Sequence, residues 1–336
     1  MKAYIDGIAY YLPSTVRENP DGRMRKKTGI ERRHVASVDE TAADMAVKAA
    51  ERLFEYISRN QIDYVLFCTQ SPDYYLPTTA CIIQDRLGLS NACGALDYNH
   101  GCTGYIYGLG LAKGLIESGQ SKCVLLLTAE TYTKYINDED LSVAPLFGDG
   151  AAATLIKAYD TDKEGIYCLE YGTDGAGFQN LIVPVGGMRN PYQSTEVTTN
   201  TDKYGNIRTN QNLFMNGSGI MEFALDVVPA TVDKILIKTN YTRQDIDYFV
   251  FHQANHFMLK SIQKICKLQD RPFYNNIRDY GNTVSSSIPI ALCDIMQETS
   301  PKTLQKSMLM GFGVGLSWGG CIVDLSKVSV VVALQR

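Results

Sequence analysis

Short apolar runs alternate with amphipathic stretches along most of the chain. Residues 62–70 ("IDYVLFCTQ"), 122–130 ("KCVLLLTAE") and 246–254 ("IDYFVFHQA") have the length and apolar content of strands buried on both faces. Residues 215–236 ("MNGSGIMEFALDVVPATVDKIL") have the period of an amphipathic helix. This alternation of strands and helices predicts an α/β fold with largely parallel sheets.

Local signals place further elements. Residues 1–13 are typical of a strand, and residues 307–326 predict a strand, a glycine-rich turn and a second strand. Ser37 and Glu40 have the spacing of a capping box before a helical pattern. The stretch from Gly186 to Asn212 is polar and aperiodic, and a loop of this length is usually functional or mobile.

Two parts of the chain resemble each other. The strands predicted at 62–70 and 246–254 are each followed by a helical stretch and a second strand-like segment. This second segment then leads through a polar turn with glycine into a helix. We interpret this as a duplicated α/β unit, with halves at residues 1–160 and 161–336; the alternative is coincidence between two aromatic-rich strands. A chain of 336 residues is also long for one hydrophobic core, which favours two halves.

Composition narrows the class of protein. Hydrophobic residues make up 45% and charged residues 20%, with a net charge of −4, which gives no reason to expect nucleic acid or an acidic membrane surface as a partner. No signal peptide or membrane-spanning run is evident. The nine cysteines form no close pairs, so we expect no metal site and reduced thiols in the cytoplasm.

One cysteine stands where a strand turns into a helix. Cys102, in "NHGCTGYIYGLG", precedes a helix predicted to begin near Thr103. Unpaired backbone N–H groups and the helix dipole favour the nucleophilic thiolate at such a position. The alternative, a small residue packed in a tight turn, is equally compatible with this stretch alone.

The second half offers partners for this cysteine. Its strand ends at His252 in "FHQAN", and its turn carries Asn282 in "YGNTVSSS". If the halves pack about a pseudo-twofold axis, Cys102, His252 and Asn282 meet at one site. A cysteine beside two neutral hydrogen-bond donors suits thioester chemistry, in which the donors stabilise an enolate oxygen.

Five segments, in order along nearly the whole chain, resemble the β-ketoacyl-acyl-carrier-protein synthase III family of the thiolase-like superfamily. They are "DYNHGCTGYIYGL", "LFGDGAAATL", "FHQANHFML", "YGNTVSSSIPIAL" and "GFGVGLSWGG". The resemblance implies a five-layered αβαβα fold built from two duplicated halves, a homodimer, and a catalytic triad of Cys102, His252 and Asn282.

The resemblance also implies a mechanism. Cys102 accepts an acyl group from an acyl-coenzyme A or acyl-carrier-protein thioester, a malonyl thioester loses carbon dioxide, and its carbanion attacks the acyl group to give a β-ketoacyl thioester. The oxyanion hole combines the backbone N–H of Cys102 with that of Gly313 or Val314. The substrates are thioesters, and no other cofactor is implied.

The chain departs from the family pattern outside this triad. Where the family holds the adenine end of coenzyme A with a tryptophan and an arginine, this chain has Arg23 and Lys27, which we retain as candidate donor-binding residues. A second nucleotide-binding arginine is replaced by Leu141 or Ser142. Two basic positions credited with docking the carrier protein are replaced by Glu222 and Phe257. These changes favour a secondary or surface-polysaccharide pathway over the initiation of fatty-acid synthesis.

Leu76 stands where the family often has a phenylalanine that crosses the dimer and closes the acyl tunnel. A smaller side chain there would admit a longer acyl group; the alternative is that Leu76 only packs the interface.

Two other functions stay open from the sequence. One is a non-decarboxylating acyltransferase that passes the acyl group from Cys102 to an alcohol or amine, with residues 186–212 shaping the acceptor site. The other is a non-catalytic partner subunit that sets chain length, which the intact cysteine, histidine and asparagine disfavour.

Overall fold

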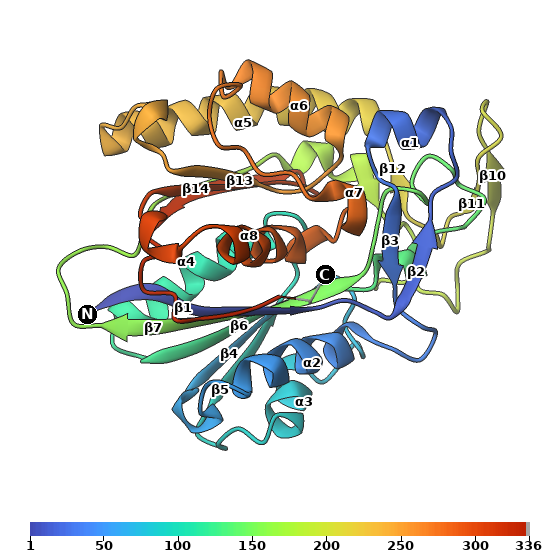
Figure 1. Cartoon of the computed structure of the whole chain (residues 1–336). Coiled ribbons are helices and arrows are strands. Elements are labelled where there is room, and N and C mark those ends of the chain that lie inside the picture. Colours follow the sequence, from blue (N-terminus) through green and yellow to red (C-terminus); the bar gives the residue numbers. More distant parts are fainter. Residues whose placement is uncertain (334–336) are drawn as a thin grey trace.

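The computed structural model describes residues 1–333, which form five alternating layers of helices and sheets (Figure 1). The first sheet has six strands in the order β16-β1-β7-β6-β4-β5. Its strands in chain order are β1 (Lys2–Tyr11), β4 (Tyr64–Cys68), β5 (Gly94–Tyr98), β6 (Cys123–Glu130), β7 (Gly150–Tyr159) and β16 (Val330–Val332).

The second sheet has four strands in the order β13-β14-β15-β8. They are β8 (Ile166–Thr173), β13 (Tyr248–Phe251), β14 (Ser307–Gly313) and β15 (Ser317–Val323). The expectation of largely parallel sheets is wrong, because both sheets are mixed. β7 runs antiparallel to both β1 and β6, and the tight turn after Gly313 makes β14 and β15 an antiparallel pair.

Two helices lie between the sheets, α4 (Gly104–Glu117) and α8 (Ser287–Glu298). α4 packs on β1, β4 and β6 of the first sheet and on β8, β14 and β15 of the second. Every residue of α8 from Ser287 to Met296 is buried, as expected of a helix enclosed on all sides.

Four helices form the two outer layers. α2 (Ala42–Phe54) and α3 (Thr79–Arg86) cover the first sheet, while α5 (Gly217–Thr239) and α6 (His256–Ile265) cover the second (Figure 1). The five-layered αβαβα fold expected from the sequence is confirmed.

The two halves are less alike than their sequences suggested. In the first half, β4 is followed by a second strand, β5, but the matching segment of the second half forms only an isolated bridge between Phe273 and Phe249. The side chain of Asn275 accepts a hydrogen bond from the Ile277 N–H at 3.1 Å, which turns the chain into the short helix α7 (Ile277–Tyr280). Among the strands of the two large sheets, those before residue 160 lie in the first sheet and those after it lie in the second, except β16.

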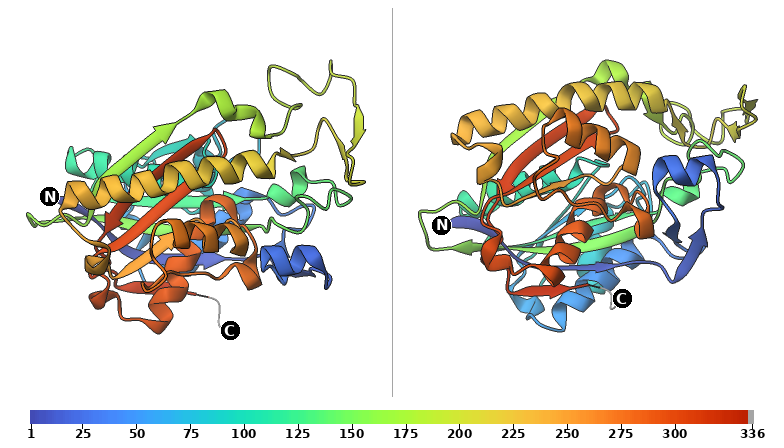
Figure 2. Two further views of the ribbon diagram at one scale, coloured as in Figure 1. Left: turned by 90° about the horizontal axis from the view of Figure 1, so that it is seen from above. Right: turned by 45° about the horizontal axis from the view of Figure 1, so that its top comes forward.

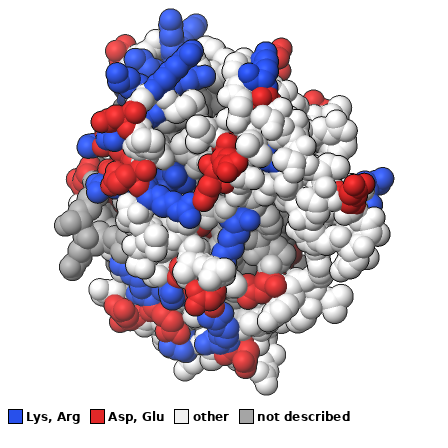
Figure 3. Space-filling model, turned by 90° about the vertical axis from the view of Figure 1, so that its right-hand side faces the viewer, with Lys and Arg blue, Asp and Glu red and all other residues white. Residues whose placement is uncertain are grey.

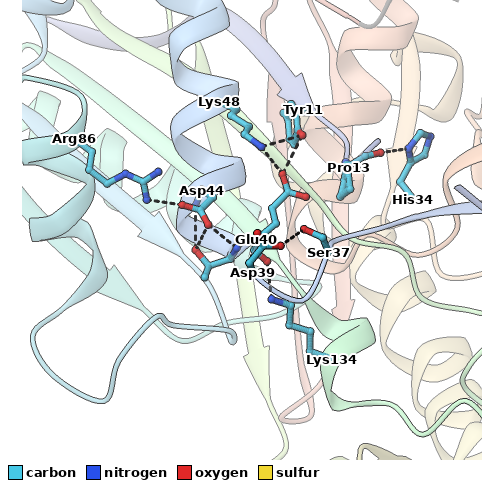
Figure 4. Close-up of polar contacts among 11 residues, drawn as sticks. Tyr11, Pro13, His34, Ser37, Asp39, Glu40, Asp44, Lys48, Arg86 and Lys134 are labelled. Atoms are coloured by element: carbon cyan, nitrogen blue, oxygen red, sulfur yellow. Dashed lines mark hydrogen bonds and ion pairs between the residues drawn. The ribbon is translucent and has the colours of Figure 1, made fainter. Parts of the chain in front are cut away.

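The start of α2 corrects one local prediction (Figure 4). Ser37 does not cap this helix, because its hydroxyl donates to Asp39 at 2.7 Å. The capping box is formed four residues later by Thr41 and Asp44, in which each side chain accepts a hydrogen bond from the other residue's backbone N–H. Glu40 instead pairs with Lys48 at 2.5 Å.

The polar stretch 186–212 is more ordered than its sequence indicated. It contains a hairpin of β10 (Thr199–Thr201) and β11 (Ile207–Thr209), which projects from the body of the molecule (Figure 2). Arg208 of this hairpin pairs with the buried Asp140 at 3.1 Å, which ties the segment to the first half.

Five smaller elements lie at the end of the molecule that carries the β10–β11 hairpin (Figure 1). They are β2 (Thr15–Glu18), α1 (Arg23–Thr28), β3 (Arg32–Val35), β9 (Leu181–Ile182) and β12 (Phe214–Met215). β2 pairs with β3, and β9 pairs with β12. Among residues 1–333, no helix is both long and apolar enough to cross a membrane, and no cluster of potential metal ligands occurs.

Close packing at the head of α4 yields a stability prediction. A Cβ atom on Gly104 would lie 2.2 Å from the sulfur of Cys68, whereas one on Gly114 in the same helix would meet nothing within 4 Å. Gly104→Ala should therefore lower the free energy of unfolding by about 2 kcal/mol through overpacking, measured by denaturant unfolding. Adding Cys68→Ala should restore part of this loss.

Gly114→Ala is the matched control, and it should stabilise the protein by about 0.5–1 kcal/mol because alanine is the better helix former. Equal effects of the two glycine substitutions would contradict the packing described here.

Candidate active site

Cys102 lies in the turn between β5 and α4, two residues before the helix begins. Its side chain is buried. β14 of the second sheet packs directly on this turn, since a Cβ atom on Gly311 would lie 2.7 Å from the carbonyl oxygen of Cys102. The second sheet thus closes over the cysteine, and only glycine permits this approach.

His252 follows the last residue of β13 and is held from two directions. Its backbone N–H donates to the carbonyl of Met310 at 2.8 Å, which continues the pairing of β13 with β14. Its ring Nδ1 lies 2.7 Å from the hydroxyl of Ser287 at the start of α8. The ring also makes an edge-to-face contact with Phe312 and hydrogen-bonds with the backbone of Val284.

Asn282 is fixed in the turn between α7 and α8. Its backbone N–H donates to Leu146 at 2.9 Å, and its carbonyl accepts from Gly148 at 3.0 Å. Its side-chain Oδ1 accepts from the backbone N–H of Val284 at 2.9 Å. Because Oδ1 is engaged, the Nδ2 group is the end of this amide that can donate to a ligand.

These three side chains line one cavity of about 80 Å³. The structure therefore brings together Cys102, His252 and Asn282, which the two duplicated segments supply from opposite halves of the chain. Most of the other lining side chains are apolar: Leu146, Phe147, Leu181, Met215, Ile220, Met258 and Phe312. None of the described residues around this cavity carries a charge at neutral pH.

Burial keeps the Cys102 thiol protonated. It raises the pKa of this thiol to about 12, and the nearby carboxyl group of Glu130 acts in the same direction. Hydrogen bonding by the backbone N–H groups of Cys102 and Val314 lowers this pKa, but by less. The expectation that the helix start would hold a resting thiolate is therefore wrong, because desolvation outweighs the helix N-terminus.

Burial also keeps His252 neutral. It lowers the pKa of the imidazole to about 3, and hydrogen bonding with the backbone of Val284 opposes this shift only in part. A neutral imidazole carries one N–H, so it can donate a hydrogen bond without introducing a positive charge.

The backbone around Cys102 distinguishes the two oxyanion-hole candidates. The N–H of Val314 hydrogen-bonds toward the Cys102 thiol together with the N–H of Cys102 itself. Gly313 has a different role, which is to allow close packing. A Cβ atom at this position would lie only 3.0 Å from both Cβ and Sγ of Cys102. The absence of a side chain at Gly313 lets the turn carrying Val314 reach the thiol.

A buried carboxyl group beside the site was not singled out from the sequence. Glu130 ends β6 and accepts hydrogen bonds from the Gln70 backbone N–H at 3.0 Å and from the hydroxyls of Ser71 and Ser285 at 3.3 and 2.9 Å. Burial raises the pKa of Glu130 to about 8. The sequence did contain a signal, because Glu130 ends a continuous apolar run that predicts a buried strand. Glutamate is rarely buried without a partner, so a glutamate at this position indicates a specific role.

The remaining predicted site residues lie outside this cavity. Arg23 and Lys27 are exposed on α1, where the Lys27 Nζ stands 5.6 Å from the centre of the Phe257 ring. In Figure 3, which faces this end of the molecule, basic side chains gather along the upper edge with acidic ones among them. Leu76 is 82% exposed in the segment before α3.

The positions that depart from the family pattern are also at or near the surface. Leu141 and Glu222 are exposed, and the Ser142 hydroxyl donates to Asp140 at 2.5 Å. None of the three lines the cavity around Cys102.

Comparison with known proteins identifies the family. Residues 96–175 match the profile of 3-Oxoacyl-[acyl-carrier-protein (ACP)] synthase III, and residues 236–325 match the profile of its C-terminal part. A relative from Clostridium perfringens, a beta-ketoacyl-[acyl-carrier-protein] synthase III, is 37% identical over 331 residues, which cover 95% of this chain and 98% of the relative.

Solved structures agree with these sequence matches. A crystal structure of a 3-oxoacyl-(acyl-carrier-protein) synthase III superposes with a TM-score of 0.92 at 45% identity, covering 96% of this chain and all of the other. A 3-oxoacyl-(acyl-carrier protein) synthase from Burkholderia xenovorans LB400 gives 0.90 at 33% identity, covering 100% and 97%. The chain therefore belongs to the 3-oxoacyl-[acyl-carrier-protein] synthase III family, with the thiolase-like fold of that family.

Proposed function

We propose that this protein is an acyltransferase of the ketosynthase III type, which condenses a Cys102-bound acyl group with a malonyl thioester. One observation carries the proposal: a thiol, a neutral imidazole and a carboxamide from two halves of the chain line a single uncharged cavity. The three groups are those that acyl transfer followed by decarboxylative condensation requires.

The first step is transfer of the acyl group. The Cys102 sulfur forms a bond to the thioester carbonyl carbon, and the bond from that carbon to the donor sulfur breaks. The thiol proton leaves Cys102 as it attacks and ends on the departing thiol. The N–H groups of Cys102 and Val314 stabilise the negative oxygen that develops on the tetrahedral intermediate.

The second step is condensation. The carboxylate of a malonyl thioester is poorly solvated against Phe147, Met215 and Phe312, so loss of neutral carbon dioxide is favoured there. The resulting enolate oxygen accepts hydrogen bonds from His252 and the Asn282 Nδ2. The enolate carbon then forms a bond to the acyl carbonyl carbon, the bond from that carbon to the Cys102 sulfur breaks, and the released thiolate takes a proton from water.

The proposed substrates are acyl-coenzyme A or acyl-carrier-protein thioesters together with a malonyl thioester. Arg23 and Lys27 stay candidates for the donor's anionic groups, because both are exposed cations on α1. Glu222 is an exposed acid on α5 and repels an acidic carrier, so docking there is not part of the proposal. The site as described needs no cofactor beyond these thioesters, and a cytoplasmic location is the proposed setting for reduced Cys102.

A homodimer is also proposed. β5 is an edge strand of the first sheet, so one side of its backbone is free to pair with a second copy. Exposed apolar side chains occur on β5 itself at Leu96, on α4 at Leu111, and in the segment before α3 at Tyr74 and Leu76. Exposed apolar side chains of this kind fit an interface better than a solvated surface, and the proposed dimer covers Leu96 on the open strand.

Substitutions should separate the two half-reactions. Cys102→Ala should abolish the acyl-enzyme adduct and the condensation product. Asn282→Asp should keep the adduct but lower condensation by at least about 100-fold, because a carboxylate would replace a donor to the enolate oxygen. Intact-protein mass spectrometry measures the adduct, and release of labelled carbon dioxide with product analysis measures the second step.

His256→Ala provides the control for this series, because His256 is exposed on α6 and should leave both half-reactions unchanged. Full condensation by Cys102→Ala would show that the proposed mechanism is wrong.

Thiol alkylation should report the raised pKa of Cys102. With a pKa near 12, the thiolate fraction grows tenfold per pH unit, so alkylation by iodoacetamide should accelerate about tenfold per unit from pH 7 to 9 without a plateau. Peptide mapping separates Cys102 from the exposed Cys81. A plateau reached by pH 8 would instead identify a resting thiolate.

Light scattering after size-exclusion chromatography should give twice the mass of one chain. Leu96→Asp should shift the protein toward the monomer, because it places charges along the proposed interface. Ile237→Asp, on the exposed face of α5, is the control and should leave the dimer intact. A monomeric wild-type protein at micromolar concentration would contradict the dimer.

A further inference from the structure

A second cavity, of about 450 Å³, adjoins the site of Cys102. Leu181 lines both cavities, and Val314, whose N–H reaches the Cys102 thiol, lines the second one. Gly101 marks the junction, because a Cβ atom there would lie 2.6 Å from the Val314 side chain and 2.7 Å from the Gln70 side-chain oxygen. The cavity therefore begins immediately beside the nucleophile.

The wall of this second cavity is unusually rich in polar groups for a space next to an acyl-accepting thiol. It contains four tyrosines and two carboxamides, namely Tyr75, Tyr132, Tyr135, Tyr192, Gln70 and Asn99. None of the described residues that line it is charged. Tyr132 is buried and belongs to the same cluster of packed side chains as Cys102.

Hydrogen bonds link several of these polar groups into one network. The Tyr132 hydroxyl donates to the Gln70 side-chain oxygen, and the Gln70 Nε2 donates to the Asn99 Oδ1 at 2.8 Å. The Tyr135 hydroxyl donates to the Gln70 backbone carbonyl at 2.8 Å. The network holds each group in one orientation, as a built recognition site requires.

This hydrogen-bond network leaves both acceptor and donor groups unused. The hydroxyl groups of Tyr132 and Tyr135 each donate one hydrogen bond, and their oxygens can still accept a hydrogen bond from a ligand. Within residues 1–333, no hydrogen bond engages the Asn99 Nδ2 or the Tyr192 hydroxyl. The cavity can therefore accept from, and donate to, a hydroxyl group on a ligand at the same time.

We propose that the acyl group loaded on Cys102 is a neutral chain that bears a hydroxyl group, and that it occupies this tyrosine-lined cavity. The inference rests on the proposed acylation of Cys102 and adds the class of acyl group. Loading forms the bond from sulfur to the acyl carbon and releases coenzyme A as its thiol, so no further reactant is needed.

The physical reason is that an alkyl chain in this cavity loses hydrogen bonds that a hydroxylated acyl chain keeps. An alkyl chain that fills the cavity would displace water from the tyrosine oxygens and the Asn99 amide without replacing its hydrogen bonds. A hydroxylated chain restores those bonds. Sites built to bind a hydroxyl discriminate strongly against analogues that lack it, whereas plain apolar pockets discriminate weakly. The lack of charged lining residues disfavours acyl groups with a free carboxylate or amine.

A matched pair of substrates tests the proposal. The wild-type protein is mixed with 3-hydroxybutyryl-coenzyme A or butyryl-coenzyme A, and the rate of adduct formation on Cys102 is followed by intact-protein mass spectrometry. The hydroxylated substrate should load at least about tenfold faster. Tyr132→Phe and Tyr135→Phe, which remove acceptor oxygens and keep the rings, should each reduce this ratio severalfold with little change in butyryl loading.

Tyr56→Phe, at an exposed ring beyond the end of α2, is the control and should keep the wild-type ratio. Equal or faster loading of butyryl-coenzyme A by the wild-type protein, or of a longer alkyl chain such as hexanoyl, would overturn the proposal while leaving the acylation of Cys102 intact. Absence of any adduct with all three acyl groups, offered both as coenzyme A and as acyl-carrier-protein thioesters, would overturn the proposed function as well. If Tyr132→Phe fails to fold, the wild-type ratio and Tyr135→Phe decide the matter.

Discussion

Removal of water from the junction of the two halves is the constraint on which this structure depends. Cys102 and His252 are both buried where α4 and α8 begin, and burial holds each in its uncharged form. A charged pair at rest would need solvent or counter-charges, and the cavity supplies neither. Charge therefore has to appear only as the reaction proceeds, at positions where backbone and side-chain N–H groups are already oriented.

The orientation of those groups comes from the sheets and not from the loops alone. β14 pairs with β13, which fixes His252 through the Met310 carbonyl, and it also presses Gly311 against the Cys102 turn. One strand thus sets the separation between the histidine and the cysteine. Val284 adds a local constraint, because it has a φ of 51° in a left-handed conformation that β-branched residues rarely adopt. The bond from its N–H to Asn282 helps to hold this strained turn.

Much of the fold could be predicted from sequence because its signals were local. Continuous apolar runs marked β4, β6 and β13, and the repeated strand-turn-helix pattern placed Cys102 and Asn282 at corresponding turns. Strand direction could not be predicted in this way, since pairing between β1 and β7 joins residues about 150 positions apart. The protonation state of Cys102 was mispredicted for a related reason. A helix start is visible in the sequence, but the burial that outweighs it depends on β14 and Glu130, which are distant in the chain.

The last described strand carries a consequence for how the protein is made. β16, at Val330–Val332, pairs in parallel with Gly7–Ala9 of β1, so the first sheet contains both the earliest and the latest strands of the described chain. During synthesis, β1 can pair with β7 long before β16 has emerged, and the edge of β1 stays open until then. Completion of the first sheet therefore waits until every strand of the second sheet has been translated, although five of its six strands are translated first. Until then, the edge of β1 that pairs with β16 has unpaired backbone groups.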